Sequence, residues 1–71
     1  MVIYMLINTR RLLQLRLENN YTTYELAKRF GVSQPHISKV ERGKTQPSIE
    51  VLLSYAREFN CTLDDLVYKQ A

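Results

Sequence analysis

The chain has 71 residues, of which 45% are hydrophobic, and a formal net charge of +3. This length allows one domain at most and excludes a second catalytic lobe, and the hydrophobic content excludes an intrinsically disordered chain. A domain of this size can bury only a small core, so self-association would add useful burial and we expect a homodimer.

Cysteine and histidine usage excludes two kinds of stabilising site. Cys61 is the only cysteine and His36 the only histidine, so the chain can form neither an internal disulfide nor a structural zinc site. We expect no cofactor, and the simplest location is the reducing cytoplasm. The apolar run at residues 2–7 is too short to span a bilayer, and its positive charges follow it. We therefore expect neither a membrane anchor nor an export signal.

The first element is an apolar N-terminal segment, residues 1–7, which precedes a predicted domain at residues 8–71. The segment has high β propensity and no polar alternation, so it is unsuited to contact with water. We expect a short strand that pairs with its copy in a second subunit or covers the C-terminal helix. The alternative is a hydrophobic lead-in to the first helix.

The first helix is predicted to begin at a cap at Asn8 or Thr9 and to end near residues 19–20. Leu12, Leu13 and Leu17 fall on one apolar stripe, which we expect to face the core.

A second and a third helix are predicted on either side of a tight turn. Thr22 and Glu25 have the spacing of a capping box, which predicts a helix at residues 23–30 that stops at Gly31. Ser33 is a second N-cap, and the helix that it begins runs to Gly43. Two short helices joined through a glycine turn are the signature of a helix-turn-helix.

Two further helices complete an all-α domain of five helices. Ser48 caps the fourth helix, and Asn60 is suited to a left-handed cap after it. The fifth helix is predicted from residue 62 through Tyr68. Apolar side chains recur at steps of three and four residues in the fourth helix, at Ile49, Leu52, Leu53, Ala56 and Phe59.

Charge and helical periodicity both indicate a binding face on the third helix. Residues 1–45 carry eight basic and three acidic side chains, a basic balance that suits a polyanion such as nucleic acid. At about 100° per residue, Ile37 and Val40 point inward. Opposite them lies a polar and basic face, and an α-helix fits the major groove of B-form DNA. The outward residues are Gln34, Pro35, Ser38, Lys39 and Arg42.

From about residue 8 to residue 67, the sequence resembles the Cro and phage-repressor type of helix-turn-helix domain, also called the XRE family. The resemblance implies a compact five-helix, lambda-repressor-like fold that inserts its third helix into the major groove, usually as a homodimer on a near-palindromic operator. The matching segments are Tyr24-Glu25-Leu26-Ala27, Gly31-Val32-Ser33-Gln34, Ile37 to Lys44, Pro47-Ser48 and Leu63-Asp64-Asp65-Leu66.

The resemblance also assigns expected roles to individual residues. Gln34, Ser38 and Lys39 match positions that read bases in the family. Arg16 and Glu41 match a basic and acidic pair that ties the first helix to the end of the third. Pro35 departs from the pattern, because many relatives have a polar residue there. Phosphate contacts are implied for Thr23, Arg42, Lys44 and Thr45.

We therefore expect a sequence-specific regulator, a repressor, whose partner is a double-stranded DNA operator. Two alternatives stay open: an antitoxin or restriction-control protein that also binds a partner protein, and a protein-interaction adaptor without DNA affinity. An enzyme is disfavoured, because the sequence has no paired carboxylates, activated nucleophile, metal cluster or phosphate loop. The tyrosines at 21, 24, 55 and 68 are expected to be packing residues.

Overall fold

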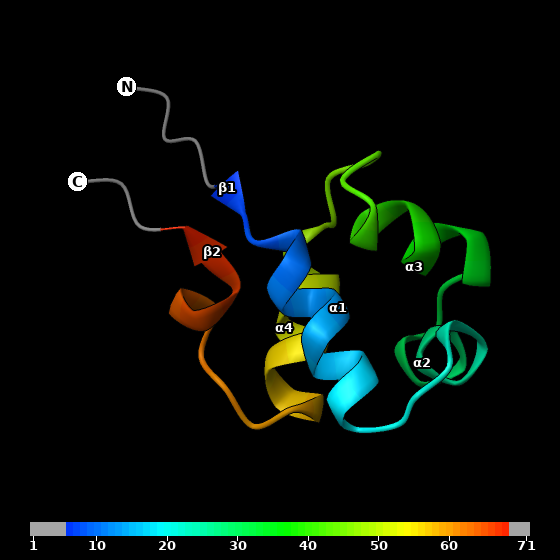
Figure 1. The fold of residues 1–71 in the computed structure, drawn as a ribbon. Helices are drawn as coiled ribbons and strands as arrows, with labels where there is room; N and C mark the ends of the chain where they lie inside the picture. Colours follow the sequence, from blue (N-terminus) through cyan, green and yellow to red (C-terminus); the bar gives the residue numbers. More distant parts are fainter. Residues whose placement is uncertain (1–5, 69–71) are drawn as a thin grey trace.

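A computed structural model of the chain describes residues 6–68, which form four α-helices, one 3-10 helix and two short strands (Figure 1). None of the helices in this range is long and apolar enough to cross a membrane. In chain order the elements are β1 (Leu6–Ile7), α1 (Thr9–Glu18), α2 (Thr23–Phe30), α3 (Gln34–Glu41), α4 (Ile49–Glu58), the 3-10 helix η1 (Leu63–Leu66) and β2 (Val67–Tyr68).

Each α-helix begins at a polar side chain that caps a free backbone amide. The side chains of Asn8, Ser33 and Ser48 accept hydrogen bonds from the amides three residues later, at 3.1 to 3.2 Å. Thr22 and Glu25 form the reciprocal capping box. Such caps satisfy amides that have no partner within the helix. The predicted starts of all four α-helices are confirmed.

The core lies where the inner sides of the helices meet, around the fully buried Tyr55. The ring of Phe30 packs edge-on against Tyr55, with ring centroids 4.9 Å apart. The ring of Phe59 also lies near Tyr55, with ring centroids 6.1 Å apart. The remaining buried side chains of this cluster are Leu12, Leu15, Leu26, Ala27, Ile37, Val40, Val51, Ala56 and Leu66.

The apolar stripe predicted for α1 is wrong in its orientation. Leu12 and Leu15 are buried, whereas Leu13 is half-buried and Leu17 is 57% exposed. The buried side is centred on Leu12 and Leu15, which lie three residues apart, with Arg16 beside them. Leu13 and Leu17 therefore lie at the margin of this side and outside it. A similar shift in α4 buries Val51, Leu52, Tyr55 and Ala56 and leaves Ile49 and Leu53 exposed.

Two of the tyrosines expected to be packing residues are instead half-exposed. Tyr24 in α2 is 54% exposed and Tyr68 in β2 is 50% exposed. Tyr55 is fully buried and Tyr21 packs against the core. Periodicity does not separate these cases, because Tyr21 precedes α2 and the exposure of the other rings depends on how their own helix or strand is rotated.

The predicted fifth helix is correct only in its first part, which is the 3-10 helix η1; its last part is the strand β2. β2 pairs antiparallel with β1, so that Leu6 lies opposite Tyr68 and Ile7 opposite Val67. Valine and tyrosine favour strands, and the Leu66 carbonyl accepts a hydrogen bond from the Asn8 amide at 2.9 Å. A strand at the N-terminus is thus present at residues 6–7, although its partner is the C-terminal segment of the same chain. Residues 1–5 of the predicted strand lie outside the described range.

A first prediction concerns Gly31, which ends α2 with a φ of 72°. A Cβ atom added at this residue would contact nothing within 4 Å. Any cost of adding a side chain there is therefore a backbone cost. We expect Gly31→Ala to lower the free energy of unfolding by about 1 to 2 kcal/mol, and Gly31→Asn by less, because asparagine visits this conformation more readily. Urea unfolding measures both values. Equal stability of the Ala variant and the wild type would contradict this account of the turn.

Candidate nucleic-acid interface

α2, α3 and the short turn between them form a helix-turn-helix. After Phe30 the chain enters the left-handed region at Gly31, and the Val32 amide donates to the Ala27 carbonyl at 3.0 Å, which closes the end of α2. Ser33 then caps α3. Ile37 and Val40 are fully buried, so the opposite side of α3 faces away from the core.

The three predicted base-reading residues lie on or beside this outer side of α3. Gln34 is its first residue and is exposed, and Lys39 is exposed in its last turn. Ser38 is half-buried, and its backbone carbonyl accepts a hydrogen bond from the Arg42 Nε at 3.4 Å. The outer side therefore offers one amide, one hydroxyl and one ammonium group.

Gln34 is linked to the start of α2 by a hydrogen bond between side chains. Its Nε2 donates to the Thr23 Oγ1 at 2.9 Å. Pro35, the second residue of α3, leaves Gln34 within the helix. A predicted base-reading residue and a predicted phosphate-binding residue are thus held together at the point where α2 and α3 approach each other.

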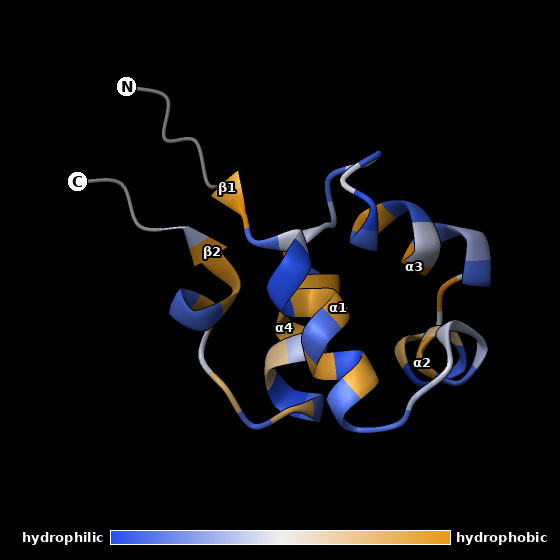
Figure 2. Cartoon of the chain, in the orientation of Figure 1, coloured by the Kyte–Doolittle hydropathy of each residue, from blue (hydrophilic) through white to orange (hydrophobic). Residues whose placement is uncertain are grey.

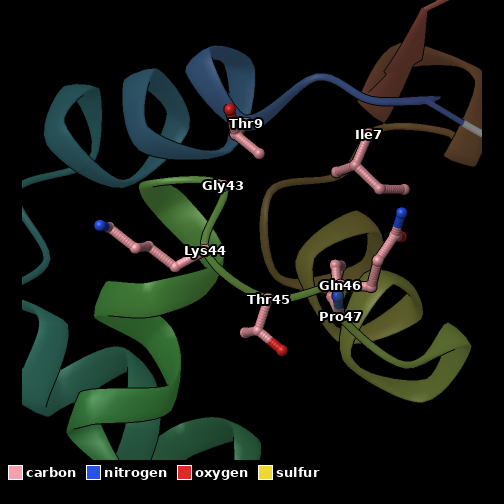
Figure 3. Close-up of a pocket in the computed structure, with 7 residues that line it drawn as sticks. All are labelled: Ile7, Thr9, Gly43, Lys44, Thr45, Gln46 and Pro47. Atoms are coloured by element: carbon pink, nitrogen blue, oxygen red, sulfur yellow. The ribbon is translucent and has the colours of Figure 1, made fainter.

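The other predicted phosphate-binding residues follow α3 directly. Arg42 caps the end of the helix, and the Lys44 amide donates to the Lys39 carbonyl at 2.8 Å, which turns the chain away from the helix. Arg42 and Lys44 are exposed, and Thr45 is half-buried. The loop is hydrophilic, in contrast to β1 (Figure 2). A pocket of about 330 Å³ lies between this loop and the start of α1, lined by Ile7, Thr9 and residues 43–47 (Figure 3).

The predicted pair of Arg16 and Glu41 is present as a buried ion pair. The Arg16 Nε donates to both carboxylate oxygens of Glu41, at 3.0 and 2.8 Å, and the side chains are 13% and 4% exposed. A terminal nitrogen of Arg16 also donates to the Tyr21 carbonyl at 2.9 Å. The pair joins α1, the loop before α2 and the last residue of α3.

Sequence reasoning missed a third partner of this pair. The Tyr55 hydroxyl donates to the Glu41 Oε2 at 3.4 Å. Burial and the neighbouring Glu41 carboxylate raise the pKa of Tyr55 far above its ordinary value, so the hydroxyl remains a donor. Its apolar surroundings in the sequence had indicated only packing, and no spacing rule connects α4 to the end of α3.

A second polar cluster that the sequence did not reveal joins α2 to α4. The Tyr21 hydroxyl donates to Glu58 at 2.6 Å, and this hydrogen bond raises the pKa of Tyr21. Arg29 lies 3.4 Å from the same carboxylate and 5.4 Å from the centre of the Tyr21 ring. Arg29 is thereby partly neutralised and is less available to an external polyanion than its charge alone suggests.

A family model described as helix-turn-helix matches residues 12–66. An HTH-type transcriptional regulator of Archaeoglobus fulgidus is 39% identical over 56 residues, which cover 79% of this chain and 79% of that protein. The HTH-type transcriptional regulator DdrOP3 of Deinococcus deserti is 39% identical over 57 residues, 80% of this chain but only 44% of that longer protein.

Among solved structures, the P22 c2 repressor protein in complex with synthetic operator 9T is similar to this chain. The TM-score is 0.73 at 32% sequence identity, and the match covers 79% of this chain and 85% of the repressor chain.

The buried pair generates a second prediction. Arg16→Met leaves the Glu41 carboxylate buried without its cation, and breaking such a pair costs roughly 3 to 5 kcal/mol. We expect a loss near the lower end, because Arg16 keeps some exposure. The double variant Arg16→Met with Glu41→Leu removes both charges and should be more stable than Arg16→Met alone. Urea unfolding measures the free energy of unfolding of each variant. A double variant less stable than Arg16→Met would contradict the cost assigned to an unpaired buried carboxylate.

Proposed function

We propose a function for this chain from the family to which it belongs, the XRE branch of the helix-turn-helix transcriptional regulators. In this proposal the chain is a repressor that binds double-stranded DNA sequence-specifically as a homodimer. The observation that carries the proposal is the exposed outer side of α3, which presents Gln34 and Lys39 while Ile37 and Val40 hold the helix to the core. An α-helix with such an outer side fits the major groove. The likeness to a phage repressor is the observation from which repression is proposed.

In this proposal α3 reads base edges with three side chains. The Gln34 amide can pair with adenine and the Lys39 ammonium with guanine, and the Ser38 hydroxyl can contact either kind of base. The hydrogen bond from Gln34 to Thr23 fixes the amide before DNA arrives, so less side-chain freedom is lost on binding. Pro35 has no donor to offer, and its ring can only make apolar contact with a thymine methyl group.

Phosphate contacts supply affinity and orientation. Thr23 at the start of α2 and Arg42, Lys44 and Thr45 after α3 lie at both ends of the recognition helix. Contacts on either side of α3 would hold it in register along the groove. Since each neutralised phosphate releases counterions, binding should weaken steeply as salt is raised.

The homodimer is proposed to form at the end of the molecule that carries β1 and β2. Leu6 and Tyr68 are paired across the two strands, and both are about half-exposed on the same face, at 51% and 50%. β1 and β2 lie at the opposite end from α3 (Figure 1). Pairing at this end leaves the outer side of α3 in each copy accessible to DNA.

Base reading by Lys39 generates a third prediction. A preferred duplex is first selected from a random pool with the wild-type protein. We expect Lys39→Ala to cost about 1 to 3 kcal/mol of binding free energy on this duplex and to relax the preference at one base pair. Lys44→Ala should instead weaken binding to every duplex equally and reduce the salt slope by about one.

Arg57→Ala, which removes an exposed cation on α4, serves as the control for these binding measurements. Its affinity should stay close to that of the wild type. An equal loss on selected and random duplexes for Lys39→Ala would make Lys39 a phosphate contact and contradict its assigned role. Absence of any salt-dependent binding by the wild type would overturn the proposed function itself.

The proposed dimer interface generates a fourth prediction. Replacing both Leu6 and Tyr68 by serine should shift the protein towards monomer, because the apolar area available for burial between copies is removed. Leu53→Ser, which also removes an exposed leucine but lies on α4, should leave the dimer intact. Sedimentation velocity gives the mass of each variant. A dimer that persists in the Leu6→Ser, Tyr68→Ser variant places the interface elsewhere.

A further inference from the structure

The outer side of α1 carries two leucines that belong neither to the buried core nor to the proposed DNA interface. Leu17 is the most exposed large hydrophobic side chain in residues 6–68. Together with Leu13 and three polar side chains it lines an open groove of about 370 Å³. We call this surface the α1 ridge; its residues are Arg10, Leu13, Gln14, Leu17 and Glu18.

The opposite side of α1 packs against the rest of the domain. Leu12 and Leu15 are in the core, and Arg16 binds Glu41. In Figure 1, α1 lies between α2 and α3 on one side and η1 and β2 on the other, and no other element of residues 6–68 lies in front of it. Since Leu12, Leu15 and Arg16 occupy the inner side, Leu13 and Leu17 lie away from it, and the exposed apolar area is available for burial against a partner.

Charges of opposite sign lie at the two ends of the α1 ridge. Arg10, at the N-terminal end, is exposed and has no hydrogen bond or ion pair with any of residues 6–68. At the C-terminal end, Glu18 accepts a hydrogen bond from Gln14 at 3.0 Å and lies 3.8 Å from Arg11, yet its side chain is still 55% exposed. A surface that is positive at one end, apolar in the middle and negative at the other end is complementary to its own copy turned by 180°.

We propose that the α1 ridge binds the α1 ridge of a second copy of this chain, with the two helices antiparallel. A register that sets Leu13 opposite the partner's Leu17 also sets Leu17 opposite the partner's Leu13. At a rise of 1.5 Å per residue, Arg10 is then only about 3 Å along the axis from the level of the partner's Glu18. Because the contact is isologous, the same ion pair forms twice.

The contact is small, which determines where it acts. A standard interface uses roughly 20 to 30 residues a side, whereas the α1 ridge offers five. Association in free solution is therefore weak. It strengthens when two copies are held near each other on DNA, because tethering raises their effective concentration. The ridge lies on a different part of the molecule from β1 and β2, so it would join two operator-bound dimers to each other.

Sedimentation velocity of the full chain over a concentration series, without DNA, tests the proposal. Leu17→Ser, Arg10→Glu and Glu18→Arg should each weaken the association step that follows the dimer by tenfold or more. The double variant Arg10→Glu with Glu18→Arg exchanges the two charges and should restore it. Both reversals place a charge where the helix dipole favours it, so loss of α1 itself does not explain a weakened step.

The control is Arg57→Glu, the same charge reversal on the exposed side of α4, which should leave the step unchanged. The proposal is overturned if Leu17→Ser associates as the wild type does, or if the charge exchange fails to restore association. If the chain does not dimerise through β1 and β2, the α1 ridge accounts for the first association step instead. In that case the same variants weaken that step, so failure of the proposed dimer interface is distinguished from failure of the ridge.

Discussion

The buried ion pair between Arg16 and Glu41 is the interaction on which the arrangement of the helices depends. It connects α1 to the last residue of α3, and Tyr55 extends it to α4. A charged pair taken out of water is stabilising only when its hydrogen-bonding groups are satisfied. Here the carboxylate accepts from both the guanidinium and a phenol, and the guanidinium also binds the Tyr21 carbonyl. The end of α3 is consequently held in one position, and the basic loop that follows it begins from a fixed point.

The same helix has two different sides. Its inner side combines Leu12 and Leu15, which are in the core, with Arg16, which binds Glu41 at the end of α3. Its other side carries Leu17, which is exposed, and Leu13, which is half-buried. In a domain this small, one helix therefore supplies both the contact that orients the recognition helix and an apolar surface that is open to a partner.

The parts of the fold that the sequence predicted are those set by local chemistry. Caps at Asn8, Thr22, Ser33 and Ser48 define the helix starts, because each cap needs only the next three residues. The outer side of α3 followed from periodicity, and the pairing of Arg16 with Glu41 from family resemblance. The failures have non-local causes. Neither the rotation of α1 and α4 nor the change of the C-terminal segment from helix to strand can be obtained without knowing the distant partners, Glu41 and β1.

Pairing of β1 with β2 joins the two ends of the described chain, whereas most helix contacts connect neighbours in sequence. Closing so long a loop costs the most chain entropy for very few hydrogen bonds. Backbone amides of these strands should therefore exchange with solvent sooner than those of α2 or α3. A second copy bound at Leu6 and Tyr68 would stabilise the pairing of β1 with β2. Dimer formation and the joining of the two chain ends would then favour each other thermodynamically.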